Sequence, residues 1–301
     1  MKKWCTYGAE VARALAINTP VVALETTVVT HGLPHPDGVA TALSLERIVR
    51  EAGATPATIG IIGGAIRVGL TAGELEQLAT TPNVAKVNLS NFAAALSSGQ
   101  PGSTTVAATM AAAHASAIRV FATGGIGGVH RELSETGDIS ADLTALSRIP
   151  VAVVCAGAKA ILDLPRTVEM LETLGVPVLG YGTDEFPAFY RRSSGLPVDR
   201  RYDSITELAT ALRLHLSLGF GTGVVIANPI PIADEMAPEL YDRALHTALL
   251  EAETQRIRGR AVTPFLLDRM DKLTGGDSVR ANVALLSHNA RVAAAIAVAA
   301  I

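Results

Sequence analysis

Short β-branched runs alternate with longer helical patterns along almost the whole chain, and this alternation most constrains the fold. Seven runs have the length and composition of strands: residues 20–29, 56–70, 85–89, 118–125, 151–157, 176–183 and 223–231. Segments with apolar residues at helical spacing separate them. Because such alternation is typical of a sheet with helices on both faces, we predict an α/β protein, layered α/β/α, with a mixed, mostly parallel central sheet.

Local signals refine this prediction at several points. Gly63 and Gly64 lie between two short apolar runs, a hairpin signal that predicts some antiparallel pairing. Thr71 and Glu74 have the spacing of a capping box at the start of a helix. Further helices are predicted over residues 37–53, 204–219, 238–259 and 262–276. No repeat, linker or composition step marks a boundary, so we predict a single domain over residues 1–301.

Composition excludes several classes of protein. The 301 residues are 49% hydrophobic, enough to bury a large core. The formal net charge is -3 and no basic stripe is present, which argues against a nucleic-acid partner. Cys5 and Cys155 are the two cysteines, too few for a disulfide framework, so we predict a cytoplasmic protein.

The ends of the chain give no sign of a membrane. The first fifteen residues lack the continuous apolar core of a secretory signal. The alanine-rich segment over residues 282–301 is interrupted by Ser287, His288, Asn289 and Arg291, so we expect a helix buried against the body or a neighbouring subunit.

Polar residues that interrupt strand patterns are the candidates for chemistry, because α/β sheets bind ligands at the carboxyl ends of their strands. Glu25 falls in the middle of the apolar pattern "VVALETTVV", where a carboxylate must be partnered or protonated. A buried structural salt bridge is the alternative. Lys86 falls in the strand pattern "AKVNL", where an edge lysine reaching water is the common explanation.

Two glycine- or hydroxyl-rich segments are candidate ligand cradles. In "GSTTVAATM", Ser103, Thr104 and Thr105 open an alanine-rich helix whose first amides suit a phosphate or carboxylate. An ordinary N-cap explains the same residues. In "FATGGIGGVH", four glycines precede His130, so main-chain amides have access to a ligand that His130 would orient. The spacing differs from a dinucleotide-binding fingerprint.

Asp138, Ser140 and Asp142 occupy alternate positions just downstream. In extended backbone their side chains lie on one side, and such oxygen ligands suit Mg²⁺ or Mn²⁺. The alternative is a helix start, with Asp138 or Ser140 as the N-cap.

Lys159 is the lone cation in "VAVVCAGAKAILDLP", where an apolar strand gives way to a helix. An apolar environment lowers the pKa of an amine, as a nucleophile that attacks a sugar C1 requires. Most lysines are solvated and inert, so the residue alone leaves both interpretations open.

Together these segments resemble the pseudouridine-5′-phosphate glycosidase family, which includes proteins called indigoidine synthase A-like. The resemblance runs from about residue 18 to the C-terminus. It is carried by "ALETTVVTHGLPHP", "GSTTVAATM", "FATGGIGGVHRELSETGDISADL", "VVCAGAKAILDLPRTVEMLETLGVPV", "DEFPAFYRRSSG", "ANPIP", "VTPFLL" and "SVRANVALLSHNA". It implies reversible cleavage of pseudouridine 5′-phosphate to uracil and ribose 5-phosphate, a divalent metal, typically Mn²⁺, and a homotrimer of α/β/α subunits.

The resemblance also implies roles for individual residues. Lys159 matches the covalent nucleophile, Glu25 the proton donor and Asp138 the metal ligand. Substrate-binding or active-site positions match Lys86, Val106, His130, Ser140, Ala141, Asp142 and Asn282. The chain departs from the family at "KVNLSNF", which lacks the basic residue and aspartate that usually follow Lys86, and in "ETT" where "EST" is common.

The chemistry of the implied reaction explains the need for such residues. A carbon–carbon bond has no heteroatom leaving group, so an iminium between Lys159 and C1′ would supply the electron sink and Glu25 the proton. Two other functions stay open: another Schiff-base enzyme acting on a sugar phosphate, and a non-catalytic accessory protein of pigment synthesis.

Overall fold

The computed structural model describes residues 1–33, 35–131, 133–257 and 262–300. Within these ranges the strands form one sheet of eleven strands, whose main path runs β1-β4-β3-β2-β7-β8-β11-β9-β10, while β5 pairs with β6 and β6 with β3. Among the described strand pairs, only β3–β4 and β3–β6 are antiparallel. The prediction of a mixed, mostly parallel sheet is confirmed.

The strands are short, as strands flanked by helices usually are. Their bounds are β1 Cys5–Tyr7, β2 Val21–Leu24, β3 Thr55–Ile62, β4 Ala65–Val68, β5 Ala85–Val87, β6 Gly102–Thr104, β7 Val120–Ala122, β8 Ala152–Cys155, β9 Val178–Tyr181, β10 Arg200–Tyr202 and β11 Val224–Ala227. All seven runs predicted from the sequence contain strands. The missed strands β1, β6 and β10 have three residues each, too few to produce a periodic pattern.

Helices lie in the segments where the sequence predicts them. The helices are α1 Ala9–Ala16, α2 Asp37–Glu51, α3 Ala72–Thr80, α4 Phe92–Ser98, α5 Val106–Ala115, α6 Leu133–Thr136, α7 Ala141–Leu146, α8 Leu164–Thr173, α9 Ile205–Ser217, α10 Pro238–Thr254, α11 Val262–Thr274 and α12 Asp277–Ala299. Of these, α1, α4 and α6 were not predicted. Short 3₁₀ turns cover Lys2–Trp4 and Ile232–Asp234, and a π-helical turn covers Val28–Gly32. The last two residues of the helix predicted over 238–259 lie outside the described residues.

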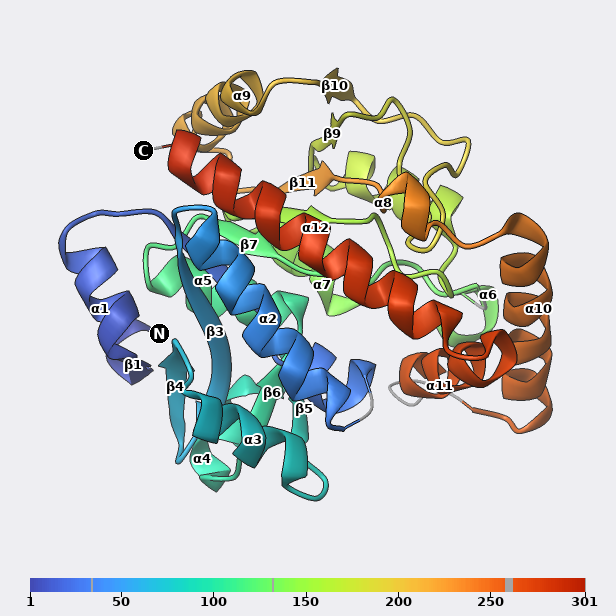
Figure 1. Cartoon of the computed structure of the whole chain (residues 1–301), viewed down its shortest axis with the longest axis horizontal. Helices are drawn as coiled ribbons and strands as arrows, with labels where there is room; N and C mark the ends of the chain where they lie inside the picture. Colours follow the sequence, from blue (N-terminus) through green and yellow to red (C-terminus); the bar gives the residue numbers. More distant parts are fainter. Residues whose placement is uncertain (34, 132, 258–261, 301) are drawn as a thin grey trace.

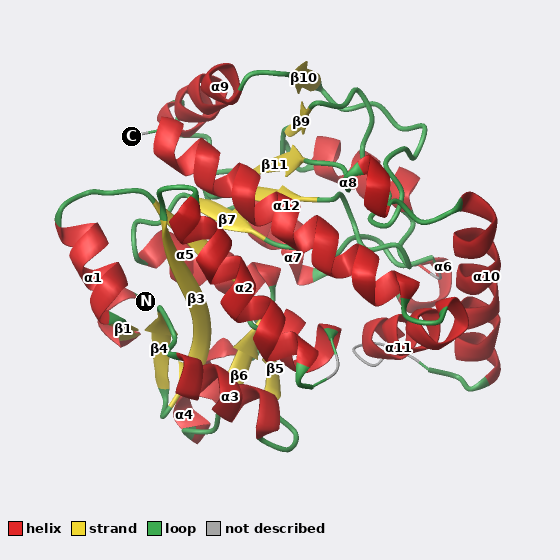
Figure 2. Ribbon diagram, in the orientation of Figure 1, coloured by secondary structure: helices red, strands yellow, loops and turns green. Residues whose placement is uncertain are grey.

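The helices form two layers around the sheet. Figure 1 shows α2 and α12 crossing the near face side by side, with α5 and α7 behind the sheet. Figure 2 shows the strands between these layers. Strands β2, β7, β8 and β11 are buried along their whole length, which explains why their sequences are almost continuously apolar.

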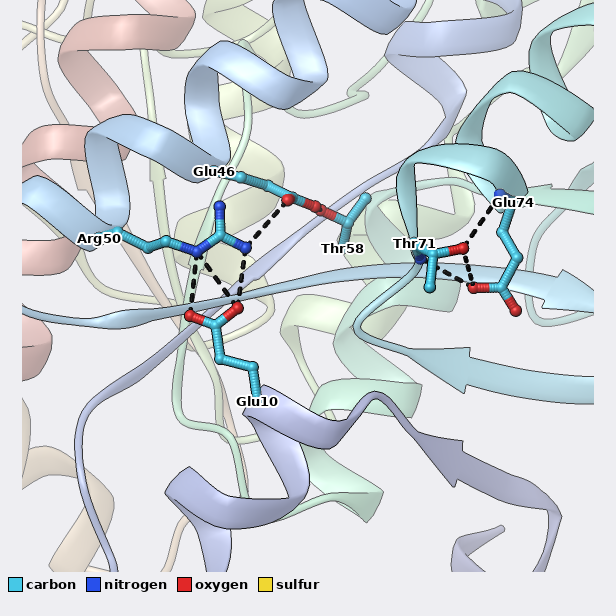
Figure 3. Close-up of polar contacts among 6 residues, drawn as sticks. All are labelled: Glu10, Glu46, Arg50, Thr58, Thr71 and Glu74. Atoms are coloured by element: carbon cyan, nitrogen blue, oxygen red, sulfur yellow. Dashed lines mark hydrogen bonds and ion pairs between the residues drawn. The ribbon is translucent and has the colours of Figure 1, made fainter.

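The local signals in the sequence correspond to real turns and caps. Gly63 and Gly64 have φ of +56° and +74° in the β3–β4 hairpin, where Ile62 pairs with Ala65. Thr71 caps α3 by accepting from the Glu74 amide, while the Glu74 carboxylate accepts from the Thr71 amide (Figure 3). The predicted hairpin and capping box are therefore confirmed.

Helix α12, with 23 residues, is long and apolar enough to cross a membrane by length and composition alone, and an 18-residue window of it has a mean hydropathy of 1.2. However, 61% of that window is buried inside the protein, and α12 packs on β2, β7 and β8. Its buried face also includes the amide side chains of Asn282 and Asn289. These features are those of a core helix, as predicted for the alanine-rich tail.

Candidate active site

Polar residues follow the ends of four neighbouring parallel strands and lie at one edge of the sheet. Glu25 directly follows β2, Thr123 follows β7 and Asn228 follows β11, while Lys159 comes four residues after the end of β8. Parallel strands have their carboxyl ends at the same edge, which is where α/β folds bind ligands. The sheet order β2-β7-β8-β11 therefore brings together residues that are about 200 positions apart in the chain.

Glu25 is a buried carboxyl at this edge, with 8% of its surface exposed. Its Oε1 accepts a hydrogen bond from the Thr123 hydroxyl. Burial raises the pKa of the Glu25 carboxyl above the ordinary value of 4.5, against the opposing effects of Lys159 and of the Thr123 hydrogen bond. This carboxyl is therefore disposed to hold a proton.

The prediction that Glu25 lies in the middle of a strand is wrong. Strand β2 ends at Leu24, and the backbone then turns into the π-helical segment Val28–Gly32. The Thr26 hydroxyl bonds the Ile59 carbonyl at 2.8 Å and the Thr27 hydroxyl bonds the Thr104 carbonyl at 2.6 Å. These side-chain bonds to neighbouring backbone replace further strand pairing after Glu25.

Lys159 lies on a hydrogen-bonded loop after β8. Its amide donates to the Ile126 carbonyl at 3.0 Å, and its own carbonyl accepts from the Leu162 amide at 3.0 Å. Gly157 precedes it with φ of +78°, and a Cβ there would lie 1.9 Å from the Pro187 carbonyl oxygen. Glycine is thus required for this path, and the loop holds the base of the lysine side chain in place.

Two adjacent cavities meet at Glu25 and Lys159. The first, here called the apolar compartment, is also lined by Val28, His31, Gly32, Thr123, Gly124, Gly125, Phe189, Pro264, Leu267, Asn282 and Leu286. The second, the polar compartment, encloses about 300 Å³ and is also lined by Asn88, Asn91, Thr105, Gly127, His130, Asp138, Ile139, Ser140, Ala141, Asp142 and Leu162. Both share Thr27, Lys86 and Thr263 with the two central residues.

Asp138 and Asp142 have different surroundings in the polar compartment. Asp142 is 5% exposed, and its two carboxylate oxygens accept from the amides of Ala107 (2.9 Å) and Gly127 (2.8 Å). Asp138 is one-third exposed, with an oxygen 3.9 Å from Nε2 of His130. Asp142 thus fastens the start of α5 to the glycine-rich turn, whereas Asp138 presents its carboxylate to the cavity.

The alternative of a helix start is confirmed for Ser140. Its hydroxyl caps α7 by accepting from the Asp142 amide at 3.2 Å. Among the described residues, no group of three or more His, Cys, Asp or Glu side chains gathers in a way that would hold a metal ion. Of the carboxylates that line the polar compartment, Asp138 is the one whose side chain is partly exposed.

The hydroxyl cluster of "GSTTVAATM" divides between core and cavity. Thr105 is the N-cap of α5 and lines the polar compartment. Thr104 is fully buried, and its hydroxyl donates to the Ile59 carbonyl at 2.7 Å, so it joins β6 to β3. Val106 is also buried, at 1% exposure, directly behind the cap. For Thr104, the prediction of a ligand-facing hydroxyl is wrong because the core takes its hydrogen bond.

The uncharged segment "KVNLSNF" forms part of the polar wall. Lys86 lies in β5, as predicted, and lines both compartments. The Asn91 side chain accepts from the Asn88 amide at 2.8 Å and donates to the Lys86 carbonyl at 3.1 Å. The asparagines therefore hold the loop that follows Lys86 through neutral hydrogen bonds.

Two residues of the apolar compartment, Phe189 and His31, were not predicted as site residues from the sequence. Phe189, with φ of +64°, lies against Gly125, where a Cβ would come within 2.7 Å of its ring. His31 bonds the Thr30 hydroxyl through Nδ1 at 2.6 Å, and burial together with Lys86 lowers its pKa. Strain in a non-glycine residue beside a cavity is a feature of functional sites, but sequence shows no backbone angles.

The site can be compared with known proteins. Residues 10–299 match the family described as indigoidine synthase A like protein. A protein of Geobacillus kaustophilus named pseudouridine-5′-phosphate glycosidase is 52% identical over 297 residues, covering 99% of both chains. A protein of the same name from Methylobacterium nodulans is 53% identical, covering 97% of this chain and 87% of its own.

Solved structures give the same relationship. The prealnumycin C-glycosynthase AlnA, in complex with ribulose 5-phosphate, superposes with a TM-score of 0.91 at 39% identity, covering 99% of this chain and 97% of AlnA. An indigoidine synthase A-like protein of Thermotoga maritima superposes with a TM-score of 0.88 at 35% identity, covering 98% and 95%. The chain is an enzyme that belongs to the indigoidine synthase A-like family, among relatives named pseudouridine-5′-phosphate glycosidases.

Proposed function

We propose that this enzyme reversibly cleaves the C-glycosidic bond of pseudouridine 5′-phosphate, giving uracil and ribose 5-phosphate through a Schiff base on Lys159. The observation that carries the proposal is the position of the Lys159 amine and the Glu25 carboxyl, which line both compartments where these meet. The names of the relatives and the sugar phosphate bound to AlnA support the same substrate class.

The two compartments match the two parts of this substrate. The polar compartment would take the ribose phosphate, with Lys86 as the cation for the phosphate and Thr105, Ser140 and His130 as hydrogen-bonding groups. The apolar compartment would take uracil, with the Phe189 ring as a flat wall and the Asn282 amide as a partner for the base. The reacting bond then lies at the junction, beside Glu25 and Lys159.

The chemistry balances most simply in the coupling direction. The Lys159 amine adds to the aldehyde C1 of open-chain ribose 5-phosphate and water leaves, giving an iminium. Carbon C5 of uracil attacks C1, and the proton on C5 passes to the Glu25 carboxylate. The C4 hydroxyl oxygen of the sugar then forms a bond to C1 as the C1–N bond breaks, and the hydroxyl proton passes to the departing nitrogen. The ring closes and Lys159 is released as an amine.

In the cleavage direction Glu25 returns that proton to C5, so that uracil departs as a neutral molecule. A carboxyl with a raised pKa suits this role, because it is protonated closer to neutral pH than an exposed glutamate is. Buried Thr123 would hold the carboxyl toward the junction through its hydroxyl.

We include Mn²⁺, one ion per subunit, in the proposal. The partly exposed Asp138 carboxylate, in a compartment with hydroxyl and imidazole groups and space for water, fits a hard cation held largely through water. When bound, the ion would supply positive charge beside the sugar phosphate. Neutralising Asp138, as Asp138→Asn, should raise the Mn²⁺ concentration required for half-maximal coupling.

Borohydride trapping tests the proposal directly. Incubation with ribose 5-phosphate and borohydride should give a reduced adduct on Lys159, located by mass spectrometry, and uracil coupling should proceed by ultraviolet absorbance. No adduct would overturn the Schiff-base mechanism. An adduct without uracil coupling would instead favour a related reaction with a different acceptor, as the naming of AlnA as a C-glycosynthase suggests.

A cytoplasmic homotrimer completes the proposal. The buried Cys155 thiol, whose pKa burial raises to about 12, and the partly buried Cys5 are both free, which suits a reducing compartment. Light scattering on the purified protein tests the oligomeric state, and a mass of one or two subunits would overturn the trimer.

A further inference from the structure

Helix α12 contributes more than the pocket residue Asn282. Asn289 lies seven residues further along, two turns away on the same buried face, and none of its surface is exposed. A fully buried amide requires hydrogen-bond partners, and those of Asn289 lie at the carboxyl ends of β7 and β11. Neither Asn289 nor Asn228, in the segments "SHNA" and "ANPIP", has a role in the reaction described above.

The hydrogen bonds of Asn289 have a fixed direction. Its Nδ2 donates to the carbonyl of Thr123 at 2.8 Å and to that of Gly124 at 3.4 Å. Since carbonyls only accept, Oδ1 of Asn289 must face the other way, where it accepts from Nδ2 of Asn228 at 2.8 Å. Asn228 is itself 1% exposed, and its backbone amide donates a hydrogen bond to the Cys155 carbonyl.

Thr123 is consequently held on both sides of its Cα. Its amide donates to the Val154 carbonyl at 3.0 Å, and its carbonyl accepts from Asn289. Its hydroxyl is then directed at Glu25. A series of hydrogen bonds thus connects four elements. Asn228 after β11 bonds Asn289 of α12, Asn289 bonds Thr123 after β7, and Thr123 bonds the carboxyl that follows β2.

We propose that Asn289, held by Asn228, is a positioning residue that fixes Thr123 so that the threonine hydroxyl orients the Glu25 carboxyl for proton transfer. This inference rests on the proposed function, because it assigns to Glu25 the transfer of a proton at C5. The orientation of the carboxyl matters because proton transfer requires one of its oxygens to point at C5. Hydrogen bonds from residues behind the site, such as Thr123 and Asn289, hold a side chain in such an orientation.

The environment of Glu25 sets the sign of the expected pH effect. The charged groups that act on it are Lys159, Lys86 and Asp142, and His31 lines the same compartment. Lys159, Lys86 and the Thr123 hydrogen bond favour the ionised carboxyl, while burial and Asp142 favour the protonated form. Weakening the Thr123 bond therefore raises the pKa of Glu25 further, without touching the charged groups.

The test uses the full-length Asn289→Ala enzyme in the uracil-coupling assay. We expect kcat to fall about tenfold, as for a lost hydrogen bond to a charged group, with KM for ribose 5-phosphate unchanged. The acidic limb of the kcat profile should move to higher pH, since coupling requires ionised Glu25. The borohydride adduct should persist, because Lys159 is untouched.

Thr123→Val and the double variant show whether Asn289 acts through Thr123. If it does, the double variant should be no slower than Thr123→Val alone, because both substitutions affect the same hydrogen bond to Glu25. Thr58→Val is the matched control: it removes another buried threonine hydroxyl that donates to a glutamate, 2.6 Å from Glu46, and should leave the pH profile unchanged.

Two results would overturn the inference: additive losses in the double variant, or an unshifted pH profile in Asn289→Ala while the wild-type enzyme couples uracil normally. If Asn289→Ala fails to fold, Asn289→Ser and Asn228→Ala are judged by the same criteria. Absence of coupling in the wild-type enzyme would instead refute the proposed function, so the two failures are distinguishable.

Discussion

Two buried glutamates in this enzyme have nearly the same local chemistry and different consequences. Glu25 and Glu46 are 8% and 7% exposed, each accepts a hydrogen bond from a buried threonine hydroxyl, and burial raises the pKa of both. Glu46 forms an ion pair with Arg50, whose Nη2 lies 3.2 Å from Oε2 of Glu46, and Arg50 also pairs with Glu10 (Figure 3). Glu25 instead opens on cavities that it shares with Lys159.

The comparison shows that burial of a carboxyl does not by itself identify a catalytic group. At Glu46 the neighbouring cation is a guanidinium that never loses its proton, so the contact fastens α2 to α1 and β3. At Glu25 the neighbouring cation is the amine of Lys159, and both residues line the two compartments. What distinguishes the two sites is the kind of cation and the presence of a cavity.

The largest expected effect comes from Lys159→Ala. Removing the amine should abolish the borohydride adduct and lower kcat by roughly 10⁴-fold or more, as for other lost nucleophiles. The fold should persist, because the contacts that fix this loop are made by its backbone. Thermal melting supplies the control, and a large fall in melting temperature would make Lys159 a structural residue.

Exchanging each glutamate for glutamine tests the comparison most directly. Glu25→Gln should lower kcat by about 10²- to 10⁴-fold, the usual contribution of a general acid or base, without loss of stability, because a neutral amide costs less to bury than a carboxylate. Glu46→Gln should keep its activity and change stability little, because burial of the Glu46 carboxylate outweighs its pairing with Arg50, and Arg50 keeps Glu10 as a partner. Steady-state kinetics measures the activity of the two variants and urea unfolding their stability. Equal activity losses in the two variants would contradict the distinction between the two glutamates.

A smaller effect is expected from the threonine partner of Glu46. Thr58→Val should lower the free energy of unfolding by about 1–3 kcal/mol, since a buried acceptor loses its donor, while kcat changes little. Urea denaturation gives the first quantity and the coupling assay the second. A kcat loss comparable with that of Thr123→Val would mean that the Glu46 cluster also serves the reaction.

The smallest effect concerns the pH dependence of stability. The pKa of Glu46 is raised by burial, so its proton is bound more tightly in the folded protein. The resulting stability is fully present below the ordinary pKa of 4.5 and is lost as pH rises through the folded value. Melting temperatures of Glu46→Gln should therefore fall less steeply over that window than those of the wild type, and parallel curves would contradict the prediction.

Much of the fold was predictable because its signals are local. Residues 151–157 are apolar throughout because β8 is buried on both faces, and Gly63 and Gly64 mark the hairpin because few other residues adopt their backbone angles. The capping box of Thr71 and Glu74 lies within one turn of helix. Edge strands such as β10 were missed, because three residues carry no periodicity.

Much less of the site was predictable. Glu25 and Lys159 stand out in the sequence as polar residues in apolar surroundings, and the structure brings them to one site. Thr104 and Thr105 are adjacent and chemically alike, yet one hydroxyl belongs to the core and the other to the cavity. Asn289 looked like a polar break in an apolar helix until the ends of β7 and β11 supplied its partners.

The sequence by itself determined the α/β architecture, the hairpin, the helix start at Thr71 and the occurrence of Glu25 and Lys159 as polar residues in apolar surroundings. These depend on periodicity, backbone freedom and desolvation, which act within a few residues or on a single side chain. Only the tertiary structure decided that Glu25 faces Lys159 while Glu46 faces Arg50, and that Asn289 reaches Thr123. Those contacts depend on which strands become neighbours, and that is set by packing over the whole chain.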